Sequence, residues 1–96
     1  MISNILIWNV RGLNRKARWD SVRSLVNSVN PDIVCLQETK KEAISVHMVL
    51  STLGSEFGQF VVLPADRTRG GMLVAWRSGK VLASHGDAKV SAYVVM

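Results

Sequence analysis

The sequence is poor in cysteine, which excludes several ways of stabilising a small protein. Cys35 is the only cysteine among 96 residues, so no internal disulfide can form, and no cysteine and histidine spacing resembles a zinc site. A lone thiol favours a reducing compartment. We therefore expect an intracellular protein, with the nucleus among the compartments that this allows.

Long apolar runs are also missing. No stretch approaches the roughly 20 residues that cross a bilayer, and the polar residues Ser3 and Asn4 come too early for the apolar core of a signal peptide. We expect no membrane partner. A chain of 96 residues has room for one small domain. With 48% hydrophobic and 20% charged residues, it should fold rather than stay disordered.

Acidic residues are fewer than basic ones. Seven Asp and Glu stand against twelve Lys and Arg, which gives a formal net charge of +5. Such a charge attracts polyanions, and nucleic acid is the partner that it favours. Many basic domains bind no polyanion, however, so the charge indicates a function only together with a motif.

Apolar periodicity predicts a strand, a helix and a second strand in the first half of the chain. The apolar run 4–9 (NILIWN) predicts a strand buried on both faces, and 33–36 predicts another. The segment between them, 15–28, is predicted to be a helix with Asn14 as its cap. Its apolar stripe, at helical spacing, consists of Val22, Leu25, Val26 and Val29.

The rest of the chain is predicted to contain one more helix, followed by strands. The helix spans 41–53, and Gly54 is placed to end it. Its expected apolar side consists of Ala43, Val46, Leu50 and Leu53. The expected strands, separated by Gly, Pro and charged turns, span 59–63, 72–76, 81–84 and 90–95.

Polar residues stand where the first two predicted strands end, in the segments WNVRGLN (8–14) and LQETK (36–40). Such strand ends are where open α/β folds bind their ligands. Asn9 offers an amide oxygen and Glu38 a carboxylate, which are hard oxygen ligands that suit Mg²⁺ together with waters and a substrate phosphate. Without further support, a turn residue and a solvated charge are the better explanation of these two residues.

With these segments in view, the chain resembles the endonuclease/exonuclease/phosphatase family, whose fold is that of deoxyribonuclease I, and especially the endonuclease domains of plant LINE-type retrotransposons. Four segments occur in the family's order: WNVRGLN, PDIVCLQETK, FVVLP and GGMLVAW. The resemblance implies that residues 1–96 are a partial domain, its amino-terminal portion. The implied fold is α/β, an incomplete two-sheet sandwich with a mixed sheet and two helices on one face.

The resemblance also implies a function, that of a metal-dependent phosphodiesterase acting ancestrally on DNA with Mg²⁺, or alternatively Mn²⁺. Glu38 is implied as the principal metal-binding carboxylate and Asn9 as a contact to the metal or the scissile phosphate, which makes both catalytic candidates. Basic residues next to the motifs are candidate nucleic-acid contacts, although a solvated surface explains them equally well: Arg11, Lys40 and Arg69.

The family's general base and its Asp-x-Asn motif do not occur in this sequence. No Asp is followed two positions later by Asn, and neither His47 nor His85 follows an Asp. Because general-base assistance contributes about 10² to 10⁴ in rate, we expect the chain alone to hydrolyse phosphodiesters poorly. Two alternatives stay open: a noncatalytic basic module that binds nucleic acid or another partner, and a relic derived from a retroelement.

The remaining conspicuous residues are expected to be structural. Trp8, Trp19 and Trp76 should pack rather than stack on bases, and Cys35, between two apolar residues, should be an inert core residue. A sandwich normally covers both faces of its sheet with apolar contacts. Since only half of the sandwich is expected, an uncovered apolar face should favour self-association.

Overall fold

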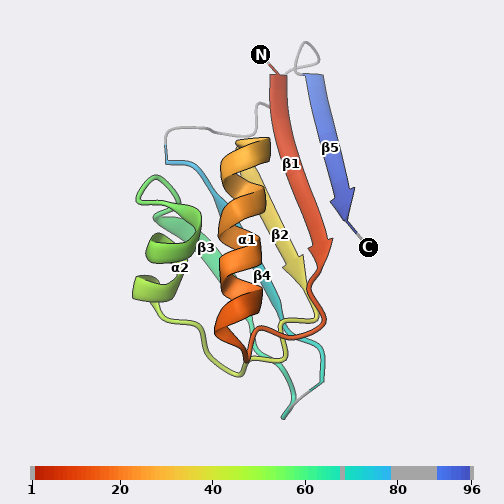
Figure 1. The fold of residues 1–96 in the computed structure, drawn as a ribbon, viewed down its shortest axis with the longest axis vertical. Helices are drawn as coiled ribbons and strands as arrows, with labels where there is room; N and C mark the ends of the chain where they lie inside the picture. The colour runs from red at the N-terminus through yellow and green to blue at the C-terminus, as the bar shows by residue number, and fades with distance from the viewer. Residues whose placement is uncertain (1, 68, 79–88, 96) are drawn as a thin grey trace.

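One mixed sheet organises the chain, and both helices lie against the same face of it (Figure 1). The computed structural model describes residues 2–67, 69–78 and 89–95. Its elements are β1 (Ile2–Asn9), α1 (Lys16–Val29), β2 (Ile33–Gln37), α2 (Val46–Leu53), β3 (Gln59–Leu63), β4 (Met72–Trp76) and β5 (Lys89–Val95).

The five strands follow the order β3-β4-β2-β1-β5. β1 is parallel to both β2 and β5, whereas β4 is antiparallel to its neighbours β2 and β3. The predicted α/β class, the mixed sheet and the placement of two helices on one face are confirmed. The strands expected at 59–63 and 72–76 have the observed bounds, and β5 begins one residue before the strand expected at 90–95. The strand expected at 81–84 lies outside the described residues.

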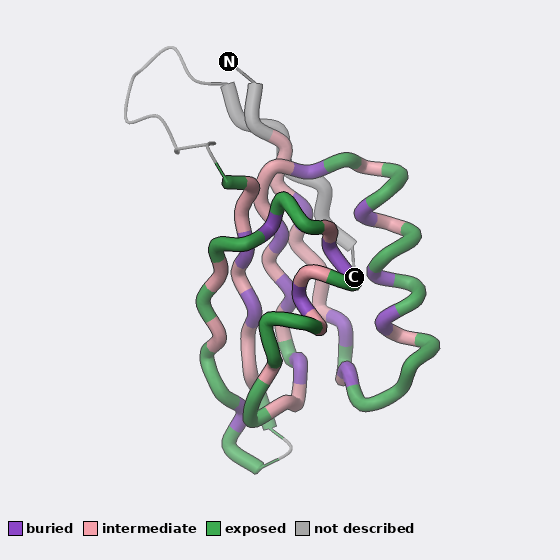
Figure 2. The backbone as a smooth tube through the Cα atoms, turned by 90° about the vertical axis from the view of Figure 1, so that its left-hand side faces the viewer, coloured by how far each residue is buried: buried purple, intermediate pink, exposed green. Residues whose placement is uncertain are grey.

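Along β2 and β4, buried residues alternate with partly exposed ones (Figure 2), and the buried ones belong to the core on the face that α1 and α2 cover. Leu6 of β1 and Val34 and Leu36 of β2 are fully buried on that face. The residues that alternate with them along the strands, such as Ile5, remain partly exposed. Successive strand side chains point to opposite faces. The prediction that β1 is buried on both faces is therefore wrong, because no described element covers the second face. We call this second face the open face.

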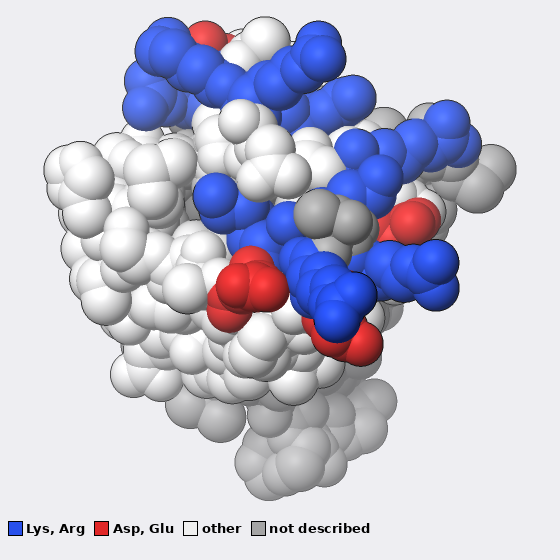
Figure 3. Space-filling view, turned by 90° about the horizontal axis from the view of Figure 1, so that it is seen from below, with Lys and Arg blue, Asp and Glu red and all other residues white. Residues whose placement is uncertain are grey.

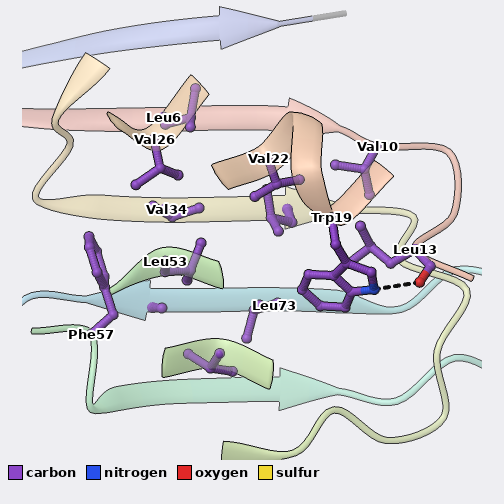
Figure 4. Packing of buried hydrophobic residues seen from close by; sticks show 13 residues of the cluster. Leu6, Val10, Leu13, Trp19, Val22, Val26, Val34, Leu53, Phe57 and Leu73 are labelled. Atoms are coloured by element: carbon purple, nitrogen blue, oxygen red, sulfur yellow. Dashed lines mark hydrogen bonds between the residues drawn. The ribbon is translucent and has the colours of Figure 1, made fainter. Parts of the chain in front are cut away.

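The core lies between the sheet and the helices, and Trp19 is its largest member (Figure 4). The Trp19 side chain is 8% exposed, and its indole Nε1 donates a hydrogen bond of 2.7 Å to the Leu13 carbonyl. Val22 and Val26 continue the buried stripe along α1. Phe57, in the loop that follows α2, belongs to the same cluster and is 1% exposed.

The beginning of α1 differs from the prediction. Arg15, in an extended conformation, is the N-cap residue, and it makes no side-chain cap hydrogen bond. The expected cap, Asn14, lies one residue earlier and is exposed. Just before these residues, Leu13 is buried, its carbonyl accepts a hydrogen bond from Trp19, and its amide donates to the Thr39 carbonyl over 2.9 Å.

The second helix is shorter than predicted and presents a different face to the core. α2 begins at Val46 rather than at residue 41, since the Ser45 side chain accepts a hydrogen bond of 3.1 Å from the Met48 amide and caps it. Upstream, the Lys41 carbonyl accepts from the Ala65 amide over 2.9 Å, which removes it from any helix ladder. Val46 is 56% exposed. The buried residues are Val49, Thr52 and Leu53.

Gly54 ends α2 as predicted, and Asn30 ends α1. Asn30 follows α1 in the left-handed conformation, and Gly54 follows α2; the amide of each donates to a carbonyl in the last turn. Among the described helices, none has the length and apolar character needed to cross a bilayer.

Arg77 connects the end of β4 to the turn that precedes β2, at the end of the sheet opposite the loops that follow β1 and β2. Its Nε donates to the Pro31 carbonyl over 2.9 Å, and its other nitrogens contact the side chains of Asn30 and Glu56. The guanidinium also lies 4.9 Å from the centroid of the Phe57 ring. With its side chain only 17% exposed, Arg77 connects segments that are far apart in sequence and stabilises their arrangement.

Candidate metal and phosphate site

Asn9 and Glu38 meet at the carboxyl ends of β1 and β2. Asn9 pairs with Gln37 in the parallel register, and Glu38 is the next residue. The Asn9 side-chain nitrogen Nδ2 donates a hydrogen bond to Glu38 Oε2. The other amide atom, Oδ1, accepts from the Arg11 amide over 3.2 Å. The structure thus brings together the two residues predicted as metal ligands.

The backbone of Glu38 is what allows this meeting. Asn9 belongs to the open face, together with Ile5 and Ile7, and an extended residue after Gln37 would point to the helix side. Glu38 instead has φ of +53°. This left-handed conformation costs a residue with a side chain about 1–2 kcal/mol, so the surrounding contacts must maintain it.

Hydrogen bonds join the loops after β1 and β2 beyond the ends of the strands. The amides of Val10, Gly12 and Leu13 donate to the carbonyls of Gln37, Glu38 and Thr39 over 3.0, 2.8 and 2.9 Å. These bonds continue the pairing of the two strands into the loops. The site is therefore held by the sheet itself rather than by free loops.

A third segment, the loop between β3 and β4, is attached to the same end of the sheet. The amides of Thr39 and Lys40 donate to the carbonyls of Gly71 and Gly70 over 3.1 and 2.8 Å. Thr39 itself is fully buried. Sequence reasoning identified neither Thr39 nor Gly71 as a site residue, because their importance comes from this contact between distant segments.

The ligand set suits a cation that keeps part of its water shell. Within the described residues, no three His, Cys, Asp or Glu side chains come together to hold a metal, so the protein offers one carboxylate and one amide. Glu38 is exposed and Asn9 partly so, which leaves room for waters and a phosphate. Mg²⁺ is commonly bound in this way. Rotation of the Asn9 amide exchanges its oxygen and nitrogen, so Oδ1 can face an ion held by Glu38.

Basic side chains gather at this end of the molecule, over the loops that follow β1, β2 and β3 (Figure 3). The three predicted nucleic-acid contacts belong to these loops: Arg11 and Arg69 are exposed, and Lys40 is partly buried. Part of Lys40 extends over Gly12, where an added Cβ would lie 3.5 Å from Lys40 Cδ.

A shallow hollow of about 580 Å³ lies among these basic residues. We call it the basic hollow; its lining residues are Asn14, Lys40, Lys41, Glu42, Ala43 and Arg67. Three of them are cationic and one is acidic, so the hollow favours an anion. Lys41 and Arg67 stand out as basic residues in the sequence, but only the fold places them together.

The other candidate residues lie away from the paired ligands. His47 is exposed on α2, and His85 lies outside the described residues. Cys35 is on the open face and only partly buried, so the prediction of a core position is wrong; burial raises the pKa of its thiol, which keeps it protonated. Of the tryptophans, Trp19 is in the core, and Trp8 packs against it.

Comparison with known proteins gives two findings. The family model described as "Endonuclease/Exonuclease/phosphatase family" matches residues 6–90. Among solved structures, the chain is similar to the AP endonuclease LMAP from Leishmania major, with a TM-score of 0.59 and 26% sequence identity over 76% of this chain and 23% of that chain. The chain thus spans about a quarter of the length of that protein. No curated protein matches it.

Proposed function

We propose, from the premise that this chain belongs to the endonuclease/exonuclease/phosphatase family, that it supplies the metal-binding part of a phosphodiesterase acting on DNA. The observation that carries the proposal is the contact between Asn9 and Glu38 at the carboxyl ends of two parallel strands. The similarity to an AP endonuclease supports a nucleic-acid substrate. We also propose that, within the family, the chain is related to retrotransposon endonucleases.

In this function, Glu38 and the Asn9 amide oxygen hold Mg²⁺ or Mn²⁺. When bound, the ion supplies electrostatic stabilisation for negative charge that develops on the phosphate. The protein's own contribution is orientation, because the loop hydrogen bonds hold the backbone around Glu38. The Arg11 amide holds the Asn9 side chain with its nitrogen toward Glu38, and this bond is given up when the amide rotates to bring its oxygen to the ion. The nearby cation of Lys40 adds attraction for a phosphate oxygen.

We expect Glu38→Gln to weaken Mn²⁺ binding to the purified chain by at least about 10- to 100-fold, since even residues that only support metal ligands contribute that much to affinity. The electron paramagnetic resonance signal of free Mn²⁺ measures the affinity. Glu42→Gln is the matched control, because it removes an exposed carboxylate close to the site. Equal affinity in the chain with Gln at position 38 would contradict the proposed site.

The same preparations test catalysis. We expect little Mg²⁺-dependent nicking of plasmid DNA by the 96-residue chain, because the sequence offers neither the Asp-x-Asn motif nor a histidine that follows an Asp. Robust nicking that Glu38→Gln abolishes would refute the expected lack of activity while supporting the metal site.

The partner that we propose for the basic end of the sheet is the phosphate backbone of DNA. Its support is the net charge of +5 and the grouping of Lys40, Lys41 and Arg67 around one hollow. A noncatalytic module that only binds nucleic acid is the second candidate, and the same charges favour it. It differs in needing no metal.

We expect Lys41→Gln and Arg67→Gln each to weaken DNA binding and to reduce the slope of log K against log salt by up to about 0.9, the contribution of one neutralised phosphate. Arg23→Gln is the control, since Arg23 donates to the Ser51 carbonyl on α2 and does not line the hollow. Fluorescence anisotropy at several salt concentrations measures both quantities. If Arg23→Gln weakens DNA binding as much, only the overall charge of the chain matters. DNA binding that depends neither on metal nor on Glu38 favours the noncatalytic module.

We further propose that the open face pairs with the open face of a second copy. None of the strand residues that β1–β4 place on this face is charged: Ile5, Ile7, Asn9, Ile33, Cys35, Gln37, Gln59, Val61, Leu63, Met72, Val74 and Trp76. Val61 and Leu63 on the edge strand β3 are 49% and 53% exposed. Two copies of this mostly apolar face can cover each other without burying an unpaired charge from these strand residues.

A further inference from the structure

The direction of the Glu38 carboxylate depends on a backbone conformation that Glu38 does not favour, and we infer that Thr39 and Gly71 are the positioning residues that impose it. The inference rests on the proposed function, because it explains how the metal-binding carboxylate is aimed. Neither residue touches the metal or the substrate. Both act through Glu38.

Thr39 is fixed by both its backbone and its side chain. Its amide donates to the Gly71 carbonyl over 3.1 Å, and its carbonyl accepts from the Leu13 amide over 2.9 Å. Its hydroxyl Oγ1 accepts from the Lys41 amide over 3.3 Å. No part of the residue is exposed. Thr39 is therefore held in one position. Because Thr39 is bonded directly to Glu38, this restricts the backbone torsion angles that Glu38 can adopt.

Lys40, on the other side of Thr39, is also left-handed, with φ of +57°. Its amide donates to the Gly70 carbonyl over 2.8 Å. Glu38 and Lys40 thus both take the conformation that residues with side chains avoid, with the buried Thr39 between them. The chain turns at both positions so that Thr39 enters the protein while its charged neighbours stay near the surface.

Gly71 provides the space into which Thr39 fits. Its φ is +87°, and a Cβ added there would overlap Thr39 Oγ1 and lie 3.2 Å from the Ala65 Cβ. Ala65 is itself buried and is held by the Lys41 carbonyl. A side chain at position 71 must therefore displace Thr39, and with it the backbone that directs Glu38.

The neighbouring Gly70 differs in one respect that makes it a control. It also has a positive φ, +71°, and its carbonyl also accepts a hydrogen bond from the loop after β2, from the Lys40 amide, but an added Cβ would meet no atom within 4 Å. Gly70→Ala therefore introduces the cost of a left-handed alanine without pressing on Thr39. Gly71→Ala introduces both.

The test compares two pairs of variants of the 96-residue chain: Gly71→Ala with Gly70→Ala, and Thr39→Val with Thr39→Ser. Valine has the shape of threonine without the hydroxyl, whereas serine keeps the hydroxyl that receives the Lys41 amide. Mn²⁺ affinity is measured as free Mn²⁺ by electron paramagnetic resonance. The Glu38 backbone is measured in metal-free protein by the intraresidue NOE between its amide and α protons, which is strong at positive φ.

We expect Gly71→Ala and Thr39→Val to weaken Mn²⁺ binding by about 10- to 100-fold, as loss of a supporting residue at a metal site does, and to weaken the Glu38 NOE. Gly70→Ala and Thr39→Ser should leave both close to those of the unsubstituted chain. In the Glu38→Gln background, Thr39→Val should cause no further loss of affinity, because its effect passes through that carboxylate.

Several outcomes would overturn the inference. An unchanged NOE and affinity in both Gly71→Ala and Thr39→Val would do so, as would equal losses in Gly70→Ala and Gly71→Ala. If circular dichroism shows that Gly71→Ala does not fold, the comparison of valine with serine at position 39 decides. If the unsubstituted chain binds no Mn²⁺, the proposed function fails, while the NOE still tells whether Thr39 and Gly71 direct Glu38.

Discussion

Replacement of Trp19 by alanine is expected to lower the free energy of unfolding by about 3–5 kcal/mol, the usual cost of removing a buried aromatic side chain. A domain of this size has about 5–14 kcal/mol in total, at 0.05–0.15 kcal/mol per residue. The substitution should therefore consume a large part of the stability. Urea denaturation followed by far-ultraviolet circular dichroism measures the change.

Two contributions of Trp19 are lost together in this variant. Its rings fill the space between α1 and the sheet, and its indole nitrogen satisfies the buried Leu13 carbonyl in the loop that leads to α1. Trp19→Phe is the control, because it keeps most of the packing and removes the hydrogen bond. A loss below about 0.5 kcal/mol in Trp19→Ala, within the range of ordinary surface substitutions, would show that this core is not what holds α1 to the sheet.

The strands were predictable because their signals are local. β3 and β4 are short apolar runs bounded by glycine, proline and charged residues, and the structure gives them the predicted bounds. The start of α2 was not predictable in this way. The segment from Lys41 has helical periodicity, but the hydrogen bond between the Lys41 carbonyl and Ala65 comes from a distant part of the chain, so tertiary contact overrides local preference.

The candidate site shows the same division. Asn9 and Glu38 could be selected from the sequence because each follows a predicted strand, and parallel neighbours end at the same edge of a sheet. The sequence did not indicate that Glu38 must reverse the strand alternation to reach Asn9. The positive φ of Glu38 produces this reversal. That conformation in turn depends on the packing of Thr39 against Gly71.

The open face gives the second large prediction. We expect the unsubstituted chain to self-associate at micromolar to millimolar concentrations, and the double substitution Val61→Lys, Leu63→Lys to make it monomeric in sedimentation velocity experiments. Burying a valine or leucine side chain contributes about 1.5–3 kcal/mol, and each 1.4 kcal/mol changes a dissociation constant about tenfold. Because both copies lose both side chains and gain facing charges, the constant should rise by more than about 100-fold.

Val46→Lys provides the matched control for this experiment. Val46 is 56% exposed, slightly more than Val61 or Leu63, but it lies on α2, on the other side of the sheet. If association depends on exposed apolar side chains in general, lysine at position 46 should disrupt it as well. If association depends on the uncharged face of the sheet, Val46→Lys should leave it intact. If the unsubstituted chain is monomeric over the same concentrations, the open face, whose strand residues are about half buried, is not apolar enough to drive association.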